Sequence, residues 1–145
     1  MRGGDDRYDR NASGKMFSLK DVNGNTIRYY IISDTAVHVV NKATSGDYYV
    51  WKNSGDDSKA YKGDIVIPET VTHPDTKKKY KVTGLWCLND SNGTFDQCTQ
   101  LRSVYLPKYI EKIFITSMFS YCYNLRYVVI NSKFKGFHGG VEISE

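Results

Sequence analysis

The chain has 145 residues, of which 40% are hydrophobic, and a formal net charge of +4. This length is sufficient for one domain with a buried core. Acidic and basic residues are interspersed, which indicates a solvated surface and argues against a nucleic-acid interface. No run approaches the roughly 18 consecutive apolar residues of a membrane span, and no apolar signal segment stands at the N-terminus.

Residues 1–15 contain almost no apolar side chains, which predicts a disordered arm. Residues 16–32 are predicted to form a β-hairpin that turns at Asn23-Gly24, a dipeptide favoured in type I′ turns. The neighbouring pattern Asp21-x-Asn23-x-Asn25 resembles the start of a calcium loop. Thr26 and Ile32 stand where that loop needs Gly and Glu, so we predict no calcium site.

Further short strands are predicted over residues 36–40, 48–51 and 61–68, where Pro68 ends the last of them because it has no N–H to donate. Residues 71–82 read as a second hairpin that turns at Pro74-Asp75. The basic run Lys77-Lys78-Lys79 then lies at the tip of this hairpin, which explains it without a nucleic-acid ligand.

One sequence motif occurs twice in the second half of the chain. The first copy is Phe95-x-x-Cys98-x-x-Leu101-x-x-Val104-x-Leu106, and the second is Phe119-x-x-Cys122-x-x-Leu125-x-x-Val128-x-Ile130. The intervals 119 − 95, 122 − 98 and 125 − 101 all equal 24. A fixed period of about 20–29 residues with spaced leucines is typical of leucine-rich repeats.

Each copy contains a short strand whose side chains alternate between two faces. Val104 and Leu106 of the first copy, and Val128 and Ile130 of the second, are predicted to point into the core. We expect these four residues to form one continuous core with Leu101, Leu125, Phe95 and Phe119. Cys98 and Cys122 pack beside them as small apolar side chains.

The predicted fold is therefore mostly β: a short right-handed leucine-rich-repeat solenoid of about two full repeats over residues 85–132. A solenoid needs a cap with a polar outer face at its end. Residues 16–84 are predicted to be this β-rich N-terminal cap, which runs into the first repeat-like strand. Residues 133–145 are predicted to be a C-terminal tail or cap.

The repeat resembles the BspA-type leucine-rich repeats of bacterial surface proteins. The resemblance rests on residues 95–107 with Ile110 and Ile113, on residues 65–71, which read Ile-Val-Ile-Pro-Glu-Thr-Val, and on residues 80–85. Thr94 and Met118 depart from the Ala that is usual before Phe. The resemblance implies a secreted or cell-surface protein that contacts a host protein or a protein of a neighbouring cell.

The outward positions of the two repeat strands are the candidate partner-binding residues, because packing fixes the inward ones. Tyr and Arg are enriched among the residues that dominate binding energy, although Tyr is also common on half-exposed sheets. Asp64 and Val66 would join the same face if the preceding strand stacks in register. The candidate residues are Arg102, Ser103, Tyr105, Arg126, Tyr127 and Val129.

Nothing in the sequence predicts catalysis, a cofactor or a metal site. The three histidines, His38, His73 and His138, belong to no catalytic motif, and no phosphate-binding or hydrolase motif is present. The three cysteines, Cys87, Cys98 and Cys122, show no paired spacing. We therefore predict a non-catalytic protein-binding module. The alternatives are a structural spacer, or a glycan-binding module that uses the aromatic cluster Tyr48, Tyr49 and Trp51. The oligomeric state stays open.

Overall fold

The computed structural model describes residues 15–40, 60–85, 93–114, 118–131 and 137–138. The predictions made for Tyr48, Tyr49, Trp51 and Cys87 lie outside these residues, as do those for most of the N-terminal arm and of the tail. The described part of the chain is mostly β and has no α-helix. No described helix is therefore long and apolar enough to cross a membrane. The strands are β1 (Met16–Lys20), β2 (Thr26–Ile31), β3 (Ala36–Val39), β4 (Gly63–Val66), β5 (Thr70–Thr72), β6 (Lys79–Leu85), β7 (Leu101–Leu106), β8 (Lys112–Phe114), β9 (Tyr127–Ile130) and β10 (Phe137–His138).

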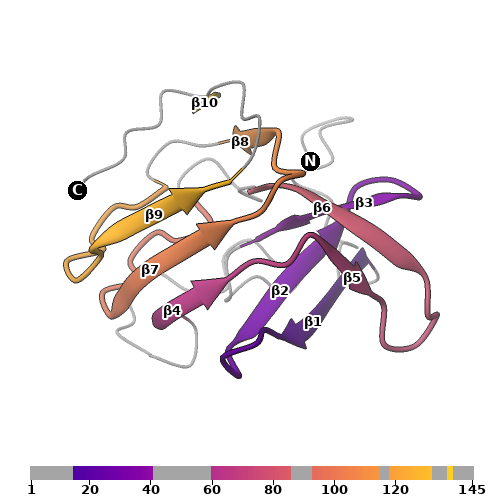
Figure 1. Ribbon diagram of the computed structural model, residues 1–145, viewed down its shortest axis with the longest axis horizontal. Coiled ribbons are helices and arrows are strands. Elements are labelled where there is room, and N and C mark those ends of the chain that lie inside the picture. Colours follow the sequence, from indigo (N-terminus) through magenta and orange to yellow (C-terminus); the bar gives the residue numbers. More distant parts are fainter. Residues whose placement is uncertain (1–14, 41–59, 86–92, 115–117, 132–136, 139–145) are drawn as a thin grey trace, which may run out of the picture.

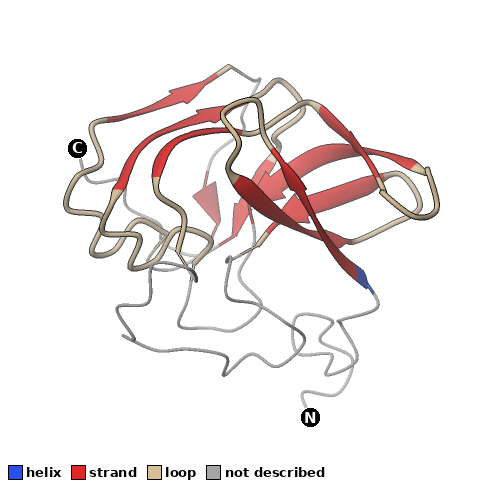
Figure 2. Cartoon of the chain, turned by 90° about the horizontal axis from the view of Figure 1, so that it is seen from below, coloured by secondary structure: helices blue, strands red, loops and turns tan. Residues whose placement is uncertain are grey.

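The strands form two sheets, which enclose a shared core (Figure 1). The larger sheet has seven strands in the order β1-β2-β3-β6-β8-β10, with β5 paired to β6 off this path. It is antiparallel from β1 to β3 and parallel from β3 through β6 and β8 to β10. The smaller sheet contains β4, β7 and β9, all parallel. Figure 2 shows the same strands from below, joined in the described part of the chain by turns and loops.

The 24-residue period of the sequence motif recurs in the pairing of the strands. The chain alternates between the sheets, from β7 in the smaller sheet to β8 in the larger, then back to β9 and on to β10. Val104 pairs with Val128 in one sheet, and Ile113 pairs with Phe137 in the other. Both offsets equal 24, so the interval extends past Ile130, where the sequence motif ends. We call residues 95–114 the first unit and residues 119–138 the second.

The two units also share a turn before the strand. Gln97 and its counterpart Tyr121 both adopt a left-handed backbone, with φ of 62° and 64°, a conformation that side chains other than Gly rarely adopt. The backbone N–H of Gln97 donates to the Ser120 carbonyl at 2.8 Å, which links the turns of the two units. In each unit the Cys and the Leu of the motif donate their backbone N–H to the residue three positions earlier.

The core is continuous through both units. The rings of Phe95 and Phe119 stack at 5.6 Å with an angle of 1° between their planes, and Tyr61 packs on Phe95 at 5.3 Å. Leu101, Val104 and Leu106 are fully buried beside them, whereas Leu125 and Val128 are partly buried against this core.

The prediction that Ile130 belongs to the continuous core is wrong, because the residue is 37% exposed. Its strand, β9, pairs with β7 on one side, and no described strand pairs with its other side. Within the described residues, no further strand lies beside β9 to cover Ile130. The same position in the first unit, Leu106, is buried because β7 lies between two neighbours.

The first hairpin forms over β1 and β2 as predicted, but its turn is not type I′. That turn needs positive φ at two residues, and of Asn23 and Gly24 only Gly24 has it, with φ of 84°. Asp21 instead closes a three-residue loop, since its backbone N–H donates to the Asn25 carbonyl at 2.8 Å. Its carboxylate also accepts the backbone N–H groups of Asn23 and Asn25, which explains the polar spacing in the sequence.

The same loop covers one edge of the smaller sheet. The backbone N–H of Val66 donates to the Asp21 carboxylate at 3.0 Å. The side-chain amides of Asn23 and Asn25 both donate to the Asp64 carbonyl, at 3.0 and 2.9 Å. Strand β4 therefore has its outer hydrogen-bonding groups occupied by side chains, and a further strand cannot pair there without displacing them.

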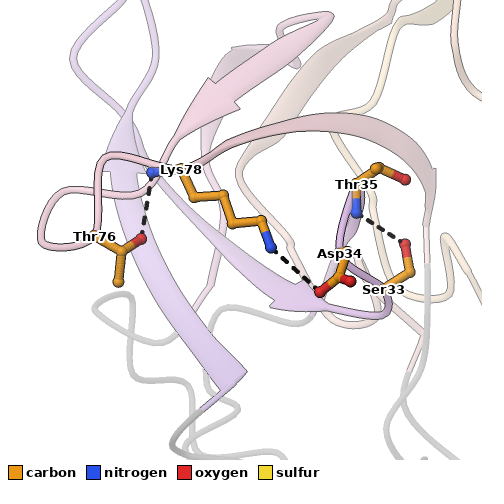
Figure 3. A network of polar contacts seen from close by, with 5 residues as sticks. All are labelled: Ser33, Asp34, Thr35, Thr76 and Lys78. Atoms are coloured by element: carbon orange, nitrogen blue, oxygen red, sulfur yellow. Dashed lines mark hydrogen bonds and ion pairs between the residues drawn. The ribbon is translucent and has the colours of Figure 1, made fainter.

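The second hairpin is confirmed, because β5 and β6 pair antiparallel and the lysine run lies at their connection. Figure 3 shows how this tip meets the connection between β2 and β3: the Lys78 ammonium lies 3.2 Å from the Asp34 carboxylate. Thr76 Oγ1 accepts the Lys78 backbone N–H, and Ser33 Oγ accepts that of Thr35. Both charged side chains are well exposed, so this ion pair contributes little to stability.

Candidate functional site

The parallel register of β4, β7 and β9 arranges the outward side chains in two rows. Asp64 pairs with Ser103, and Ser103 pairs with Tyr127. In the next row, Val66 pairs with Tyr105, and Tyr105 pairs with Val129. We call these six residues, together with Arg102 and Arg126, the outward face. The structure thus brings together the six candidate residues, with Asp64 and Val66 beside them.

The sequence predicts that Ser103 is available to a partner, but the structure shows that it is buried. Its hydroxyl donates to Asp64 Oδ1 at 2.7 Å, and the residue is 6% exposed. A hydroxyl held between a carboxylate and neighbouring strands is occupied internally. Ser103 therefore fixes the position of Asp64 in the outward face and offers almost no contact surface of its own.

Arg102 reaches the outward face through an irregularity in the ladder. Gly63 pairs with Leu101 and Asp64 with Ser103, so Arg102 is an extra residue without a partner on β4. Such a bulge redirects a side chain away from strict alternation. The Arg102 guanidinium lies 3.5 Å from Asp64 Oδ2, with both side chains about half exposed. Solvent screens this pair, so it orients the guanidinium more than it stabilises the fold.

Tyr105 is held at its hydroxyl. Asn131, which follows β9, donates its side-chain amide to this oxygen at 2.9 Å. The ring is therefore anchored at both ends, by β7 and by the second unit, and is half-buried. A side chain with its rotamer already fixed loses little conformational entropy when a partner binds.

The second unit supplies the most exposed part of the outward face. Tyr127 is 58% exposed and Val129 is 41% exposed. The Arg126 backbone N–H donates to the Arg102 carbonyl at 2.8 Å, which places Arg126, the residue before β9, beside Arg102 of β7. Arg126 is exposed, and among the described residues no carboxylate forms an ion pair with it.

Two more exposed tyrosines lie in the turn that precedes β9. The rings of Tyr121 and Tyr123 meet edge to face at 6.0 Å. Their positions in the first unit are Gln97 and Thr99, which are polar. The sequence motif did not single out these residues, because it follows the buried positions of the repeat and not the exposed ones.

The two described cysteines are free thiols that serve packing. Cys98 is buried, and its sulfur accepts the backbone N–H of Tyr61 at 3.3 Å. The Cys122 thiol donates to the Phe95 carbonyl at 3.0 Å, which ties the two units together. Burial raises the pKa of the Cys122 thiol to about 12. Since the thiolate is the nucleophile, Cys122 is unsuited to catalysis near neutral pH.

We expect both Cys98 and Cys122 to react slowly with a thiol reagent in the folded protein at neutral pH, and rapidly in denaturant. The reason is that burial protects both sulfurs and keeps Cys122 protonated. Mass spectrometry after timed labelling, with peptide mapping, measures each cysteine separately. Fast labelling of both residues without denaturant would show that the turns of the two units are open in solution.

The described residues contain no cluster of three or more side chains suited to a metal ion. The Asp21 carboxylate, which belonged to the calcium-like pattern, accepts backbone N–H groups from Asn23, Asn25 and Val66 instead. The sequence analysis therefore missed the role of Asp21 in covering β4. The signal was present as closely spaced Asp and Asn, which commonly bond to nearby backbone groups.

Comparisons with known proteins find only weak structural similarity. No family model and no curated protein matches the chain. A leucine-rich cell surface protein from Faecalibacterium prausnitzii A2-165 aligns with a TM-score of 0.46 and 19% identity over 85% of this chain. The pneumococcal vaccine antigen PcpA aligns with a TM-score of 0.28 and 14% identity over 83% of this chain. The chain spans 26% and 40% of these two chains.

Proposed function

We propose that this chain is a non-catalytic module that binds a protein partner through the outward face of β4, β7 and β9. In this proposal the two units and their β-rich lead-in form a short leucine-rich-repeat solenoid with an N-terminal cap. The resemblance of the repeat sequence to BspA-type repeats supports a secreted or cell-surface location in a bacterium. The cap proposal is supported by the loop around Asp21, which closes the β4 edge with polar side chains.

The observation that carries the proposal is a comparison of the two units. Their buried positions are alike, since Phe95, Cys98 and Leu101 recur as Phe119, Cys122 and Leu125. Their other positions differ. Gln97, Thr99 and Ser103 of the first unit correspond to Tyr121, Tyr123 and Tyr127 of the second, all three of which are exposed. At one outward position the change is the reverse, since Tyr105 corresponds to Val129.

Packing does not explain these tyrosines, because exposed positions carry no core contacts. Residues exposed to solvent are mostly polar, whereas these three exposed positions of the second unit are aromatic. Tyr combines a large contact area with a directed hydrogen bond and is enriched in protein interfaces. A spacer that only displays another domain would not need these side chains, which is why binding is the better-supported function.

The double variant Tyr105→Ala with Tyr127→Ala is expected to abolish binding to a partner isolated with the parent chain as bait. The two rings stand on neighbouring strands of the outward face, and truncation of such anchors typically costs about 2 kcal/mol or more each. Extracts of host-cell and neighbouring-cell surface proteins provide the candidate partners. Affinity for the isolated partner is then measured by calorimetry or surface plasmon resonance.

The matched control is Tyr109→Ala, which removes a half-buried ring that lies outside the three strands and contacts Lys81 and Lys108. This variant is expected to keep the affinity of the parent. Full affinity in the folded double variant would contradict the proposed face. A parent chain that captures no partner from any of these extracts would favour the spacer.

A further inference from the structure

The dipeptide Asn23-Gly24, in the loop that covers β4, is chemically reactive as well as structural. Asn is a thermolabile side chain, and it reacts fastest when Gly follows, because Gly has no Cβ to shield the backbone nitrogen. Asn23 and Gly24 are both exposed. Apart from the chain neighbours of Gly24, no heavy atom lies within 4 Å of the point where its Cβ would stand. Solvent therefore reaches both residues.

The reaction open to this dipeptide is deamidation, which needs only water and hydroxide. The Gly24 nitrogen loses its proton to hydroxide and attacks Asn23 Cγ. A bond forms between that nitrogen and Cγ, the bond from Cγ to Nδ2 breaks, and Nδ2 takes up a proton and leaves as ammonia. Water then opens the resulting succinimide ring at either of its two carbonyls. The product at position 23 is aspartate, or isoaspartate, in which the main chain runs through Cγ.

The folded loop holds both reacting groups in other contacts. The Gly24 backbone N–H donates to the Asp21 carbonyl at 3.0 Å, and the Asn23 side-chain amide donates to the Asp64 carbonyl at 3.0 Å. Both bonds must open before the nitrogen can lose its proton and Cγ can turn toward it. The loss of one hydrogen bond typically shifts an equilibrium about fivefold. Two such bonds therefore slow the reaction at least tenfold relative to the unfolded chain.

We propose that Asn23 is a site of spontaneous deamidation, that closure of the β4 edge sets the rate of this reaction, and that the product opens the edge. The Asn23 amide is a donor to the Asp64 carbonyl, whereas an ionised carboxylate can only accept. After deamidation the new carboxylate faces that carbonyl oxygen and repels it. It also adds a second negative charge to the loop that contains the Asp21 carboxylate.

The isoaspartate product changes the loop further, because it lengthens the main chain by one carbon. The loop is short and closed, since the Asp21 backbone N–H donates to the Asn25 carbonyl at 2.8 Å. An extra main-chain atom inside it displaces Asn25, whose side-chain amide is the second donor to the Asp64 carbonyl. Isoaspartate therefore weakens both side-chain contacts with β4, whereas aspartate weakens mainly the contact made by position 23.

Asp64 connects this loop with the outward face. Its carbonyl accepts the Asn23 amide, and its carboxylate accepts the Ser103 hydroxyl and lies 3.5 Å from the Arg102 guanidinium. Deamidation thus loosens the residue that orients Arg102. Any effect on a partner rests on the proposed function. The modification itself does not, and both experiments below are carried out on the chain alone.

Timed incubation at mildly alkaline pH, followed by peptide mapping with mass spectrometry, measures the rate at each Asn. We expect Asn23 to react at least tenfold more slowly in the folded chain than in guanidinium chloride. In denaturant it should react as fast as Asn92, which also precedes Gly. Asp21→Ala removes the carboxylate that accepts the Asn23 backbone N–H and is expected to speed the reaction severalfold while circular dichroism shows the chain folded. Equal rates in the folded and denatured parent, or no acceleration in folded Asp21→Ala, would overturn the proposal.

Asn23→Asp tests the effect of the product without relying on the reaction or on Asp21→Ala. Amide exchange at Val66, which donates to the Asp21 carboxylate, is expected to be at least threefold faster than in the parent. Because the effect includes charge repulsion, added salt should reduce it. Asn124→Asp is the matched control: its amide donates to the Thr99 carbonyl at 2.8 Å, away from the loop, and Val66 exchange should match the parent. Parent-like exchange in Asn23→Asp, or equal acceleration in both variants, would contradict an edge opened by deamidation.

Discussion

Leu101→Ala is expected to destabilise the folded chain by about 2–5 kcal/mol, the range typical for truncation of a fully buried leucine. Leu101 has no exposed surface and packs in the continuous core with Phe95 and Val104. A domain of this size has a free energy of unfolding of roughly 5–15 kcal/mol. The loss should therefore lower the melting temperature clearly in a calorimetric or circular-dichroism scan.

Leu125→Ala is the matched comparison, because Leu125 holds the same motif position in the second unit but is only partly buried. Less apolar surface returns to water when it is truncated, so we expect a smaller loss, on the order of 1 kcal/mol. Equal losses would mean that the second unit is packed as tightly as the first. Unchanged melting in both variants would contradict the repeat as the basis of the core.

Asp21→Ala is expected to destabilise the chain by about 2–3 kcal/mol, since hydrogen bonds to charged groups contribute about 1.5–3 kcal/mol and several are lost here. The Asp21 carboxylate accepts backbone N–H groups within its own loop and from Val66 on β4. Denaturant unfolding measures the loss. The Val66 amide should also exchange with solvent faster in the variant.

Asn23→Ala provides a graded control for the same edge. It removes one of the two side-chain amides that donate to the Asp64 carbonyl and leaves the Asp21 carboxylate in place. We expect a loss well below that of Asp21→Ala and little change in exchange at Val66. If Asp21→Ala leaves both the stability and the Val66 exchange unchanged, the loop does not close the β4 edge in solution.

The mostly β architecture and the register of the two units were predictable because they depend on buried side chains that repeat. A constant offset of 24 residues places Val104 beside Val128, and strand alternation then decides which neighbours point outward. This reasoning located the outward face, including Asp64 and Val66 of the preceding strand. The description of the whole as a right-handed solenoid with a cap remains a prediction.

The errors have a common physical origin in contacts between residues far apart in the sequence. Ser103 is outward by alternation but covered, because Asp64, 39 positions earlier, accepts its hydroxyl. Ile130 matches a buried position in the motif but lies on an edge strand. The three-residue loop after β1 depends on the Asp21 carboxylate, which a dipeptide preference for Asn23-Gly24 does not take into account.

The central claim is that the two units stack at an offset of 24 residues and so form one outward face. Cross-strand nuclear Overhauser contacts in a spectrum of the isotope-labelled chain test it most directly. The account predicts parallel-sheet contacts that link Ser103 with Tyr127, Val104 with Val128 and Tyr105 with Val129, together with contacts between the rings of Phe95 and Phe119. An antiparallel pattern, or contacts at any other offset between these strands, would contradict it.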